Sequence, residues 1–205
     1  MPTLDKRAFL AGLGAASAVR AQSPAPPATP ATRVALTTSL GVITVALATD
    51  KAPVTSANFL RYVDAKRYDG GVFYRAMKLA PEPNPNGLIQ GGIKNDPAKV
   101  FPPIAHEPTT KTGLKHVNGT ISLARYAPGS AQAEFFICIG DQPSLDADPS
   151  QPGDNLGFAA FGAVTDGMDT ARKILASPTS PTEGEGAMKG QMLSPPIPIL
   201  TARRV

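Results

Sequence analysis

Apolar and polar residues alternate along eight short segments of the chain, which is the spacing of strands that bury one face. We expect strands at residues 33–38, 41–47, 72–76, 88–92, 120–124, 134–139, 159–164 and 197–203. Ser39-Leu40 joins the first two as an antiparallel hairpin, and Pro195-Pro196 leads into the last. Residues 93–118 and 177–190 lack this periodicity, and we expect loops there.

Two further segments repeat their apolar residues at helical spacing. The positions from Val54 to Val63 predict a helix from Pro53 to about residue 66, with the proline in its first turn, and residues 168–176 predict a second helix. The chain also has 22 prolines and 19 glycines, which favour turns and short strands. This pattern predicts a mainly β fold that closes into a barrel, because closure removes exposed strand edges.

The strand predicted at 72–76 is apolar or aromatic except for Arg75. Strict alternation places Phe73 and Arg75 on one face, and Val72 and Tyr74 on the other. A single arginine in such a strand lies either at a solvent-exposed edge or at the mouth of an apolar pocket. The segment alone leaves both interpretations open.

The N-terminal residues have the layout of an export signal. Lys6-Arg7 form a basic start, residues 8–19 are small and apolar, and Val19-Arg20-Ala21 is a cleavage site of the small-x-small type. Residues 5–10 also resemble a twin-arginine signal in which lysine replaces the first arginine, so the export route stays open. An amphipathic first helix is the alternative interpretation. We expect an exported, periplasmic protein with a signal at 1–21, a Pro/Ala-rich linker at 22–32 and a folded domain at 33–205.

Composition excludes several functional classes. The net charge of +4 falls to +2 without residues 1–21, too little to indicate binding to nucleic acid. No apolar run approaches the roughly 20 residues that span a bilayer, so stable membrane insertion is not expected. Cys138 is the single cysteine, which rules out an intramolecular disulfide and a cysteine-based metal site.

Residues with chemical potential do not form a familiar motif. The serines at 122, 130 and 144 have no nucleophile elbow around them, and the two histidines lie ten residues apart in an irregular segment, so a serine hydrolase is not expected. His106, Glu107 and His116 match no standard metal-ligand spacing. The pairs Asp146/Asp148 and Glu183/Glu185 are interpreted as solvated loop charge. We expect neither a metal nor a cofactor.

Five sequence words occur in one order and with compatible spacing, and together they resemble the cyclophilins, the barrel-shaped class of peptidyl-prolyl cis-trans isomerases. The resemblance extends from about residue 33 to 205. Its words are Phe73-Tyr74-Arg75, Gln90-Gly91-Gly92, Ser122-Leu123-Ala124-Arg125, Glu134-Phe135-Phe136-Ile137-Cys138 and Phe161-Gly162. The resemblance implies an eight-stranded antiparallel barrel capped by two helices, which binds proline-containing polypeptides on its outer surface. We expect a monomer.

The resemblance also implies roles for individual residues. Arg75 matches the catalytic arginine and Gln90 the glutamine that orients it. The pocket for the proline ring would have Phe136 as its aromatic floor, and Leu88 and Leu145 as aliphatic walls. Ala124 and Arg125 match the rim that holds the substrate backbone.

The chain departs from the family at several positions. Glu134 replaces a glutamine, and it either ion-pairs with Arg75 and restrains it or holds it in place. Gly87 stands where a pocket phenylalanine is frequent, and Phe158 stands where a histidine is frequent, so one aromatic wall is exchanged for another. Ser144 aligns near a frequent tryptophan, which predicts weak cyclosporin binding.

Two hypotheses follow from the resemblance. The first is an exported prolyl isomerase in which Arg75 donates a hydrogen bond to the twisted prolyl amide of folding polypeptides. The alternative is a catalytically weakened cyclophilin-like module that binds peptides.

Overall fold

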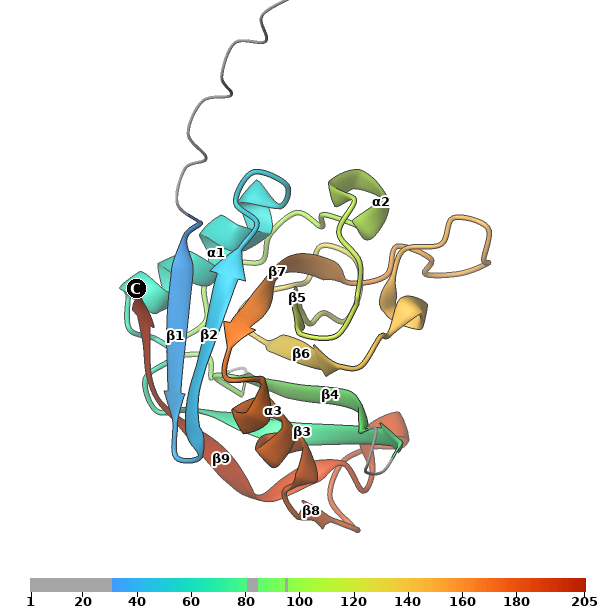
Figure 1. The fold of residues 1–205 in the computed structure, drawn as a ribbon. Helices are drawn as coiled ribbons and strands as arrows, with labels where there is room; N and C mark the ends of the chain where they lie inside the picture. The colour runs from blue at the N-terminus through green and yellow to red at the C-terminus, as the bar shows by residue number, and fades with distance from the viewer. Residues whose placement is uncertain (1–30, 81–84, 95) are drawn as a thin grey trace, which may run out of the picture. The chain divides into compact units, whose positions relative to one another are not determined.

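The computed structural model describes residues 31–80, 85–94 and 96–205 of the chain (Figure 1). The predicted export signal and nearly all of the predicted linker lie outside the described residues. The strands are β1 (Arg33–Thr38), β2 (Gly41–Leu47), β3 (Gly71–Ala80), β4 (Asn86–Gly92), β5 (Thr120–Leu123), β6 (Phe135–Ile139), β7 (Ala159–Asp166), β8 (Thr179–Ser180) and β9 (Met192–Arg204). The helices are α1 (Pro53–Asp64), α2 (Thr109–Thr112) and α3 (Met168–Ala176), with 3-10 turns η1 (Pro143–Leu145) and η2 (Gly186–Met188).

Eight strands close into an antiparallel barrel. Their order is β1-β2-β7-β5-β6-β4-β3-β9, and a pairing between β1 and β9 joins the two ends of the sheet. β1 and β2 pair from Arg33↔Ala46 to Thr38↔Gly41, which confirms the predicted hairpin. The predicted mainly β barrel is therefore confirmed.

Four short elements were not predicted from the sequence, and one of them is η1. The short strand β8 extends the sheet from β9, and both β8 and η2 lie in the segment 177–190 that was expected to be a loop. The four-residue helix α2 interrupts the segment 93–118. These elements are too short to produce a periodic pattern of apolar residues, so periodicity cannot predict them.

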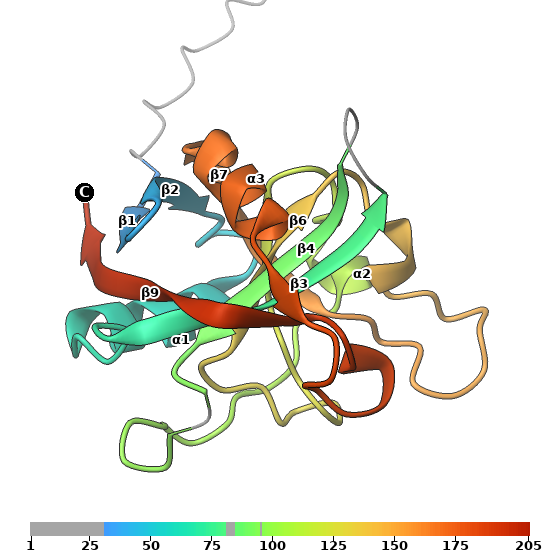
Figure 2. The same cartoon turned by 90° about the horizontal axis from the view of Figure 1, so that it is seen from below.

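Helices α1 and α3 lie over opposite ends of the barrel (Figures 1 and 2). Pro53 occupies the first turn of α1, as predicted. The first amide groups of that helix donate to a distant side chain: Glu107 accepts from the N–H of Val54 at 3.3 Å and of Thr55 at 2.8 Å. A carboxylate at a helix N-terminus satisfies amide groups that have no partner inside the helix and interacts favourably with the helix dipole.

Aromatic side chains fill the barrel. The Phe59 ring from α1 packs against Tyr68 at 5.2 Å, Phe135 at 5.6 Å and Phe161 at 5.3 Å between ring centroids. Phe73 contacts Phe135 edge to face at 5.7 Å. Each of these rings is fully buried, and burial of this size dominates the stability of a core. The barrel is thus packed inside, so a substrate site has to lie on its outer surface.

Candidate active site

An open cavity of about 580 Å³ lies outside the barrel, lined by residues of β3, β4, β6 and β9 and by the segment that follows β5. All nine residues that the sequence singled out line this cavity: Arg75, Leu88, Gln90, Ala124, Arg125, Glu134, Phe136, Leu145 and Phe158. The structure therefore brings the predicted site residues together from distant parts of the chain. The roles assigned to them by resemblance stay predictions at this point.

A bulge in β3 directs Arg75 into the cavity. The register of β3 with both β4 and β9 shifts between Phe73 and Arg75. Phe73 is fully buried in the barrel core, whereas Tyr74 and Arg75 both line the cavity. The prediction that Phe73 and Arg75 share a face was wrong, because an extra residue interrupts the alternation of the strand.

Two glutamines hold the Arg75 guanidinium. Nη1 of Arg75 donates to Oε1 of Gln90 at 3.0 Å, and Nε donates to Oε1 of Gln191 at 2.8 Å. The amide of Gln191 in turn donates to the carbonyl of Ala187 at 2.8 Å, which ties it to η2. Burial lowers the pKa of Arg75, while the neighbouring Tyr74 acts in the opposite direction. An arginine pKa is so high that the group still carries its charge at neutral pH.

Tyr74 continues this network on the other side of Gln90. The Gln90 amide nitrogen donates to the Tyr74 hydroxyl at 2.8 Å, which leaves the amide oxygen facing Arg75. Burial raises the pKa of Tyr74 strongly, and the charge of Glu134 and a hydrogen bond with it act in the same direction. Glu134 itself is 7% exposed and accepts from the N–H of Ile93 at 3.1 Å. Tyr74 therefore stays protonated at neutral pH.

Beside Arg75 lies an apolar pocket. Leu88 and Phe136 are buried, and the half-buried side chains of Met77, Leu145 and Phe158 pack against them. Phe158 meets Phe136 edge to face at 5.4 Å, with the two rings at 90°. Such a pair fixes the orientation of both rings. Phe158 is thus part of the pocket wall, as expected from the sequence.

Gly87 cannot supply a wall to this pocket. Its φ is +152°, and a Cβ atom on it would lie 1.9 Å from the carbonyl oxygen of Met77 on the paired strand. Any larger residue would have to separate β3 from β4. Met77, whose cross-strand partner is Leu88, adds apolar surface at this position instead.

Arg125 uses its side chain within the protein. It bonds the carboxylate of Asp154 at 2.6 and 2.8 Å and the carbonyl of Gly157 at 2.6 and 2.9 Å, and its guanidinium lies 5.3 Å from the Phe158 ring centroid. These contacts hold the loop that carries Phe158. The predicted part of Arg125 and Ala124 in holding a substrate backbone stays a prediction.

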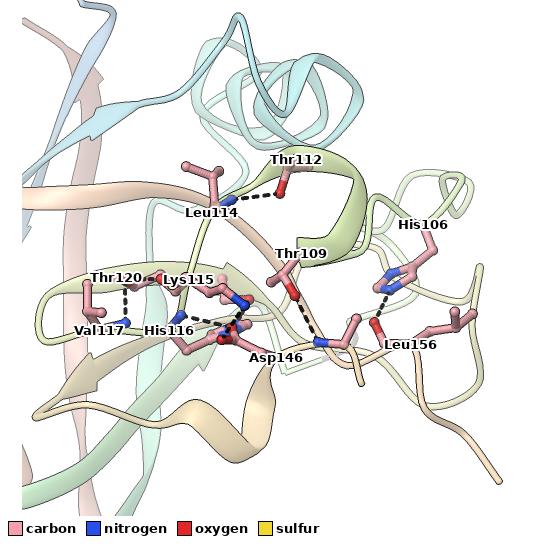
Figure 3. A network of polar contacts seen from close by, with 12 residues as sticks. His106, Thr109, Thr112, Leu114, Lys115, His116, Val117, Thr120, Asp146 and Leu156 are labelled. Carbon is pink, nitrogen blue, oxygen red and sulfur yellow. Dashed lines mark hydrogen bonds and ion pairs between the residues drawn. The ribbon is translucent and has the colours of Figure 1, made fainter. Parts of the chain in front are cut away.

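A second polar network lies behind the Phe136 ring, on which His116 stacks. Its contacts of Asp146 with His116 and Lys115 can be followed in Figure 3. Nδ1 of His116 lies 2.8 Å from Oδ1 of Asp146, and Nε2 lies 2.9 Å from Oγ of Ser122. The imidazole stacks on Phe136 with 5.8 Å between centroids and 17° between planes. Lys115 bonds the other oxygen of Asp146 at 3.3 Å. The interpretation of Asp146 as solvated loop charge was wrong, since its side chain is 13% exposed and bound on both oxygens.

The protons of this network can be assigned. A carboxylate only accepts, so Nδ1 of His116 donates to Asp146, and in the neutral ring Nε2 accepts from the Ser122 hydroxyl. Burial lowers the pKa of His116, against the hydrogen bond and charge of Asp146. Ser122, His116 and Asp146 are the residue types of a hydrolase triad, yet Ser122 is 0% exposed. A substrate cannot reach its oxygen, which supports the exclusion of a serine hydrolase.

The three candidate metal ligands each have a different structural partner. His106 donates from Nε2 to the carbonyl of Leu156 at 3.0 Å, Glu107 caps α1, and His116 serves the network beneath Phe136. No group of three or more His, Cys, Asp or Glu side chains within the described part of the chain is arranged to hold a metal ion. Cys138 is buried next to the pocket, and burial raises its pKa to about 12.

Comparison with known proteins identifies the family and the fold. The sequence model of the cyclophilin type peptidyl-prolyl cis-trans isomerases matches residues 33–203. The chain belongs to the cyclophilin family. It is 38% identical over 175 residues to peptidyl-prolyl cis-trans isomerase A of Dickeya dadantii, covering 83% of this chain and 85% of that protein. It is 37% identical over 147 residues to isomerase B of Escherichia coli, covering 67% and 80%.

Solved cyclophilins share the fold. A Cryptosporidium parvum cyclophilin superposes with a TM-score of 0.67 at 20% identity, over 85% of this chain and 98% of that one. The same protein crystallised in the presence of the dipeptide Ala-Pro gives 0.66. This cyclophilin is accordingly an enzyme of the peptidyl-prolyl cis-trans isomerase class.

Several residues of the cyclophilin site were missed from sequence. Met77 carried a usable signal, because it is two residues from Arg75 and resumes the strand alternation after the bulge. Gln191 and Met188 had no recognisable sequence signal, since they lie in or beside a segment expected to be a loop. Only the fold brings that segment next to the cavity and Arg75. His116 appeared isolated because its partners are 6 and 30 residues away in sequence.

Proposed function

We propose that this cyclophilin accelerates rotation about X-Pro bonds by a hydrogen bond from Arg75 to the prolyl nitrogen. The rotation barrier of about 18–20 kcal/mol arises from amide resonance. Twisting the bond breaks the resonance, and the nitrogen regains a lone pair that accepts a hydrogen bond. A guanidinium fixed beside an apolar pocket stabilises that twisted state more than either planar state.

The observation that carries the proposal is how Arg75 is held. Gln90 and Gln191 engage Nη1 and Nε, while Nη2 lies 3.7 Å from the sulfur of Met77, a weak acceptor. Exchanging this weak contact for the prolyl lone pair therefore costs little. A thousandfold acceleration needs about 4 kcal/mol of selective stabilisation. One charge-assisted hydrogen bond together with a clamped proline ring is of that order.

The substrates that we propose are proline-containing segments of folding polypeptides. The proline ring would rest on Phe136 between Leu88 and Leu145, as implied by the family resemblance. Because the cavity of about 580 Å³ extends beyond this pocket, it also has room for neighbouring residues of the peptide. The Ala-Pro dipeptide present with the Cryptosporidium relative is of the same chemical type.

We further propose that Glu134 holds Arg75 indirectly. The Glu134 carboxylate interacts with the Tyr74 hydroxyl through its charge and a hydrogen bond. The Tyr74 hydroxyl accepts a hydrogen bond from the Gln90 amide nitrogen, and the Gln90 amide oxygen accepts one from Arg75. In this arrangement the negative charge fixes the direction of the Gln90 amide. The sequence left two roles open for Glu134: an ion pair that restrains Arg75, or a contact that holds Arg75 in place. This chain of hydrogen bonds favours the second role.

The test is a protease-free prolyl isomerisation assay on the wild type and on Arg75→Ala. We expect kcat/KM to fall by about a hundredfold to a thousandfold, the usual cost of removing a donor to a transition state. Arg75→Lys is the matched control, since it keeps the charge but loses the fork of donors that contacts both glutamines. Equal rates for wild type and Arg75→Ala, with peptide binding retained, would favour the weakened binding module instead.

We propose that the protein is exported to the periplasm through residues 1–21. Among the described residues, no helix combines the length and apolar character needed to cross a membrane. N-terminal sequencing of the native protein should give a start near Gln22. A native protein that begins at Met1 would contradict the proposal.

A further inference from the structure

Met77 lies where the apolar pocket meets the Arg75 guanidinium. Its sulfur is 3.7 Å from Nη2 of Arg75, and its side chain packs with Leu88 and Phe136. The side chain is half-buried and lines the open cavity. The Met77 side chain thus touches both the donor and the pocket of the proposed mechanism, and it is open to the cavity.

The backbone makes this position important for the pocket. The opposite strand contributes Gly87, which cannot carry a side chain because a Cβ atom would meet the Met77 carbonyl at 1.9 Å. The wall on this side of the pocket is therefore formed by Met77 and its cross-strand partner Leu88. A chemical change of Met77 alters the wall directly.

The thioether is open to one well-defined reaction. Hydrogen peroxide transfers one oxygen atom to the sulfur, which loses two electrons, and the peroxide is reduced to water. The product, methionine sulfoxide, is polar and is returned to methionine by methionine sulfoxide reductases. Its oxygen is a much stronger hydrogen-bond acceptor than the thioether sulfur.

We propose that Met77 is an oxidation site whose sulfoxide inhibits the isomerase. This inference rests on the proposed function of Arg75. The sulfoxide oxygen would lie within reach of Nη2, the nitrogen that is left for the prolyl lone pair, and would bind it. The same oxygen would place a polar group in the pocket for the proline ring, so substrate binding weakens as well.

The remaining sulfur atoms of the described residues provide controls. Met188 and Met192 line the same cavity from η2 and β9, and Met168 packs against the core. Cys138 is fully buried with its pKa raised to about 12, so its reactive thiolate is scarce at neutral pH. Oxidation at each position can be followed separately, because peptide mass spectrometry resolves a gain of one oxygen.

The experiment treats the full chain with hydrogen peroxide and measures isomerase activity and oxidation at each methionine. In the wild type we expect activity to fall about tenfold in step with Met77 sulfoxide, and a sulfoxide reductase to restore it. Each variant is compared with its own untreated sample. Met77→Leu should keep most of its starting activity, while Met188→Leu and Met192→Leu should lose theirs as the wild type does.

Two results would overturn the proposal. One is full conversion of Met77 to the sulfoxide with unchanged activity. The other is a loss in Met77→Leu as large as in the wild type, which would assign the inhibition to a different residue.

Failure of the proposed function is recognised independently. If the untreated wild type is no faster than Arg75→Ala, the catalytic role of Arg75 fails. Calorimetric affinity for a proline-containing peptide then tests Met77 on its own. Weaker binding by about fivefold after oxidation, absent in Met77→Leu, would support an oxidation-sensitive pocket, and unchanged binding would refute it.

Discussion

Two polar networks lie on opposite sides of Phe136. The outer one joins Arg75 to Gln90 and Gln191 and faces the cavity. The inner one joins His116 to Ser122 and Asp146 beneath the ring. Hydrogen-bond lengths are similar in the two, from 2.8 to 3.0 Å, so what separates the networks is access to solvent and substrate.

The comparison shows that residue types and distances do not define an active site. The inner network has the constellation that catalyses acyl transfer elsewhere, but its serine is buried within the sheet. There it supports the pocket floor. The outer network has no nucleophile and needs none, because rotation about an amide requires only a donor held in an open, largely apolar site. We therefore expect changes in the inner network to affect mainly stability, and changes in the outer one mainly turnover.

The largest effect is expected for His116→Leu. The substitution leaves the buried Ser122 hydroxyl without its partner, which costs about 1–3 kcal/mol. It also removes one of the two hydrogen bonds to Oδ1 of Asp146, which keeps the bond from the backbone N–H of residue 116, and it removes the ring that stacks on Phe136. We predict that the free energy of unfolding, measured by urea denaturation, falls by about 2–4 kcal/mol. The matched control is His106→Leu, a half-buried histidine of the same segment with one hydrogen bond to Leu156. A loss in His106→Leu equal to that in His116→Leu would contradict the role of the inner network.

A smaller effect, on turnover, is expected for Gln90→Leu. Without the amide oxygen Arg75 keeps its charge but loses one of the two side chains that orient it, so kcat/KM should fall about tenfold, or about 1.4 kcal/mol. The free energy of unfolding should change by less than about 1 kcal/mol. Gln151→Leu, on the exposed loop before Asp154, is the control and should leave both quantities unchanged. If Gln90→Leu lowers stability more than turnover, the contrast between the networks fails.

The smallest effect is a dependence of stability on pH. Burial lowers the pKa of His116 in the folded state, so the unfolded chain, with a histidine pKa of about 6.5, binds the proton more readily. The stabilisation is therefore complete above about pH 6.5 and is lost as the pH falls below it, by at most about 1.4 kcal/mol per pH unit. Asp146 contributes to the dependence of stability on pH at lower pH than His116 does. Burial alone would raise its pKa, but the bonds from His116 and Lys115 outweigh burial and lower it.

Urea denaturation between pH 5 and pH 7.5 measures this slope. His116→Leu should flatten it. A slope that persists unchanged in His116→Leu would assign the proton uptake to a different group.

The sequence predicted the strands of the barrel well. β1 and β2 alternate buried and less buried positions, whereas β5 and β6 are short apolar runs that are buried at every position. All nine site residues that the family resemblance indicated line the cavity, although other lining residues, such as Met77 and Met188, were missed. What it predicted wrongly was local: strict alternation put Phe73 and Arg75 on one face, and only the pairing of β3 with β4 and β9 reveals the bulge. A bulge depends on the partner strands, so a single strand's pattern cannot show it.

By itself the sequence predicted a closed β barrel, since hydrophobic periodicity is a property of the chain alone. The sequence words added, through the family resemblance, an arginine beside an apolar pocket. The tertiary structure decided which side chains meet. It brought Gln191 into contact with Arg75, although the two are 116 residues apart in the sequence. It likewise brought Asp146 into contact with His116, 30 residues away in the sequence, beneath the pocket floor. It also placed Met77 against both the guanidinium and the apolar pocket. Such contacts depend on barrel closure and register, which join residues without regard to their separation in sequence.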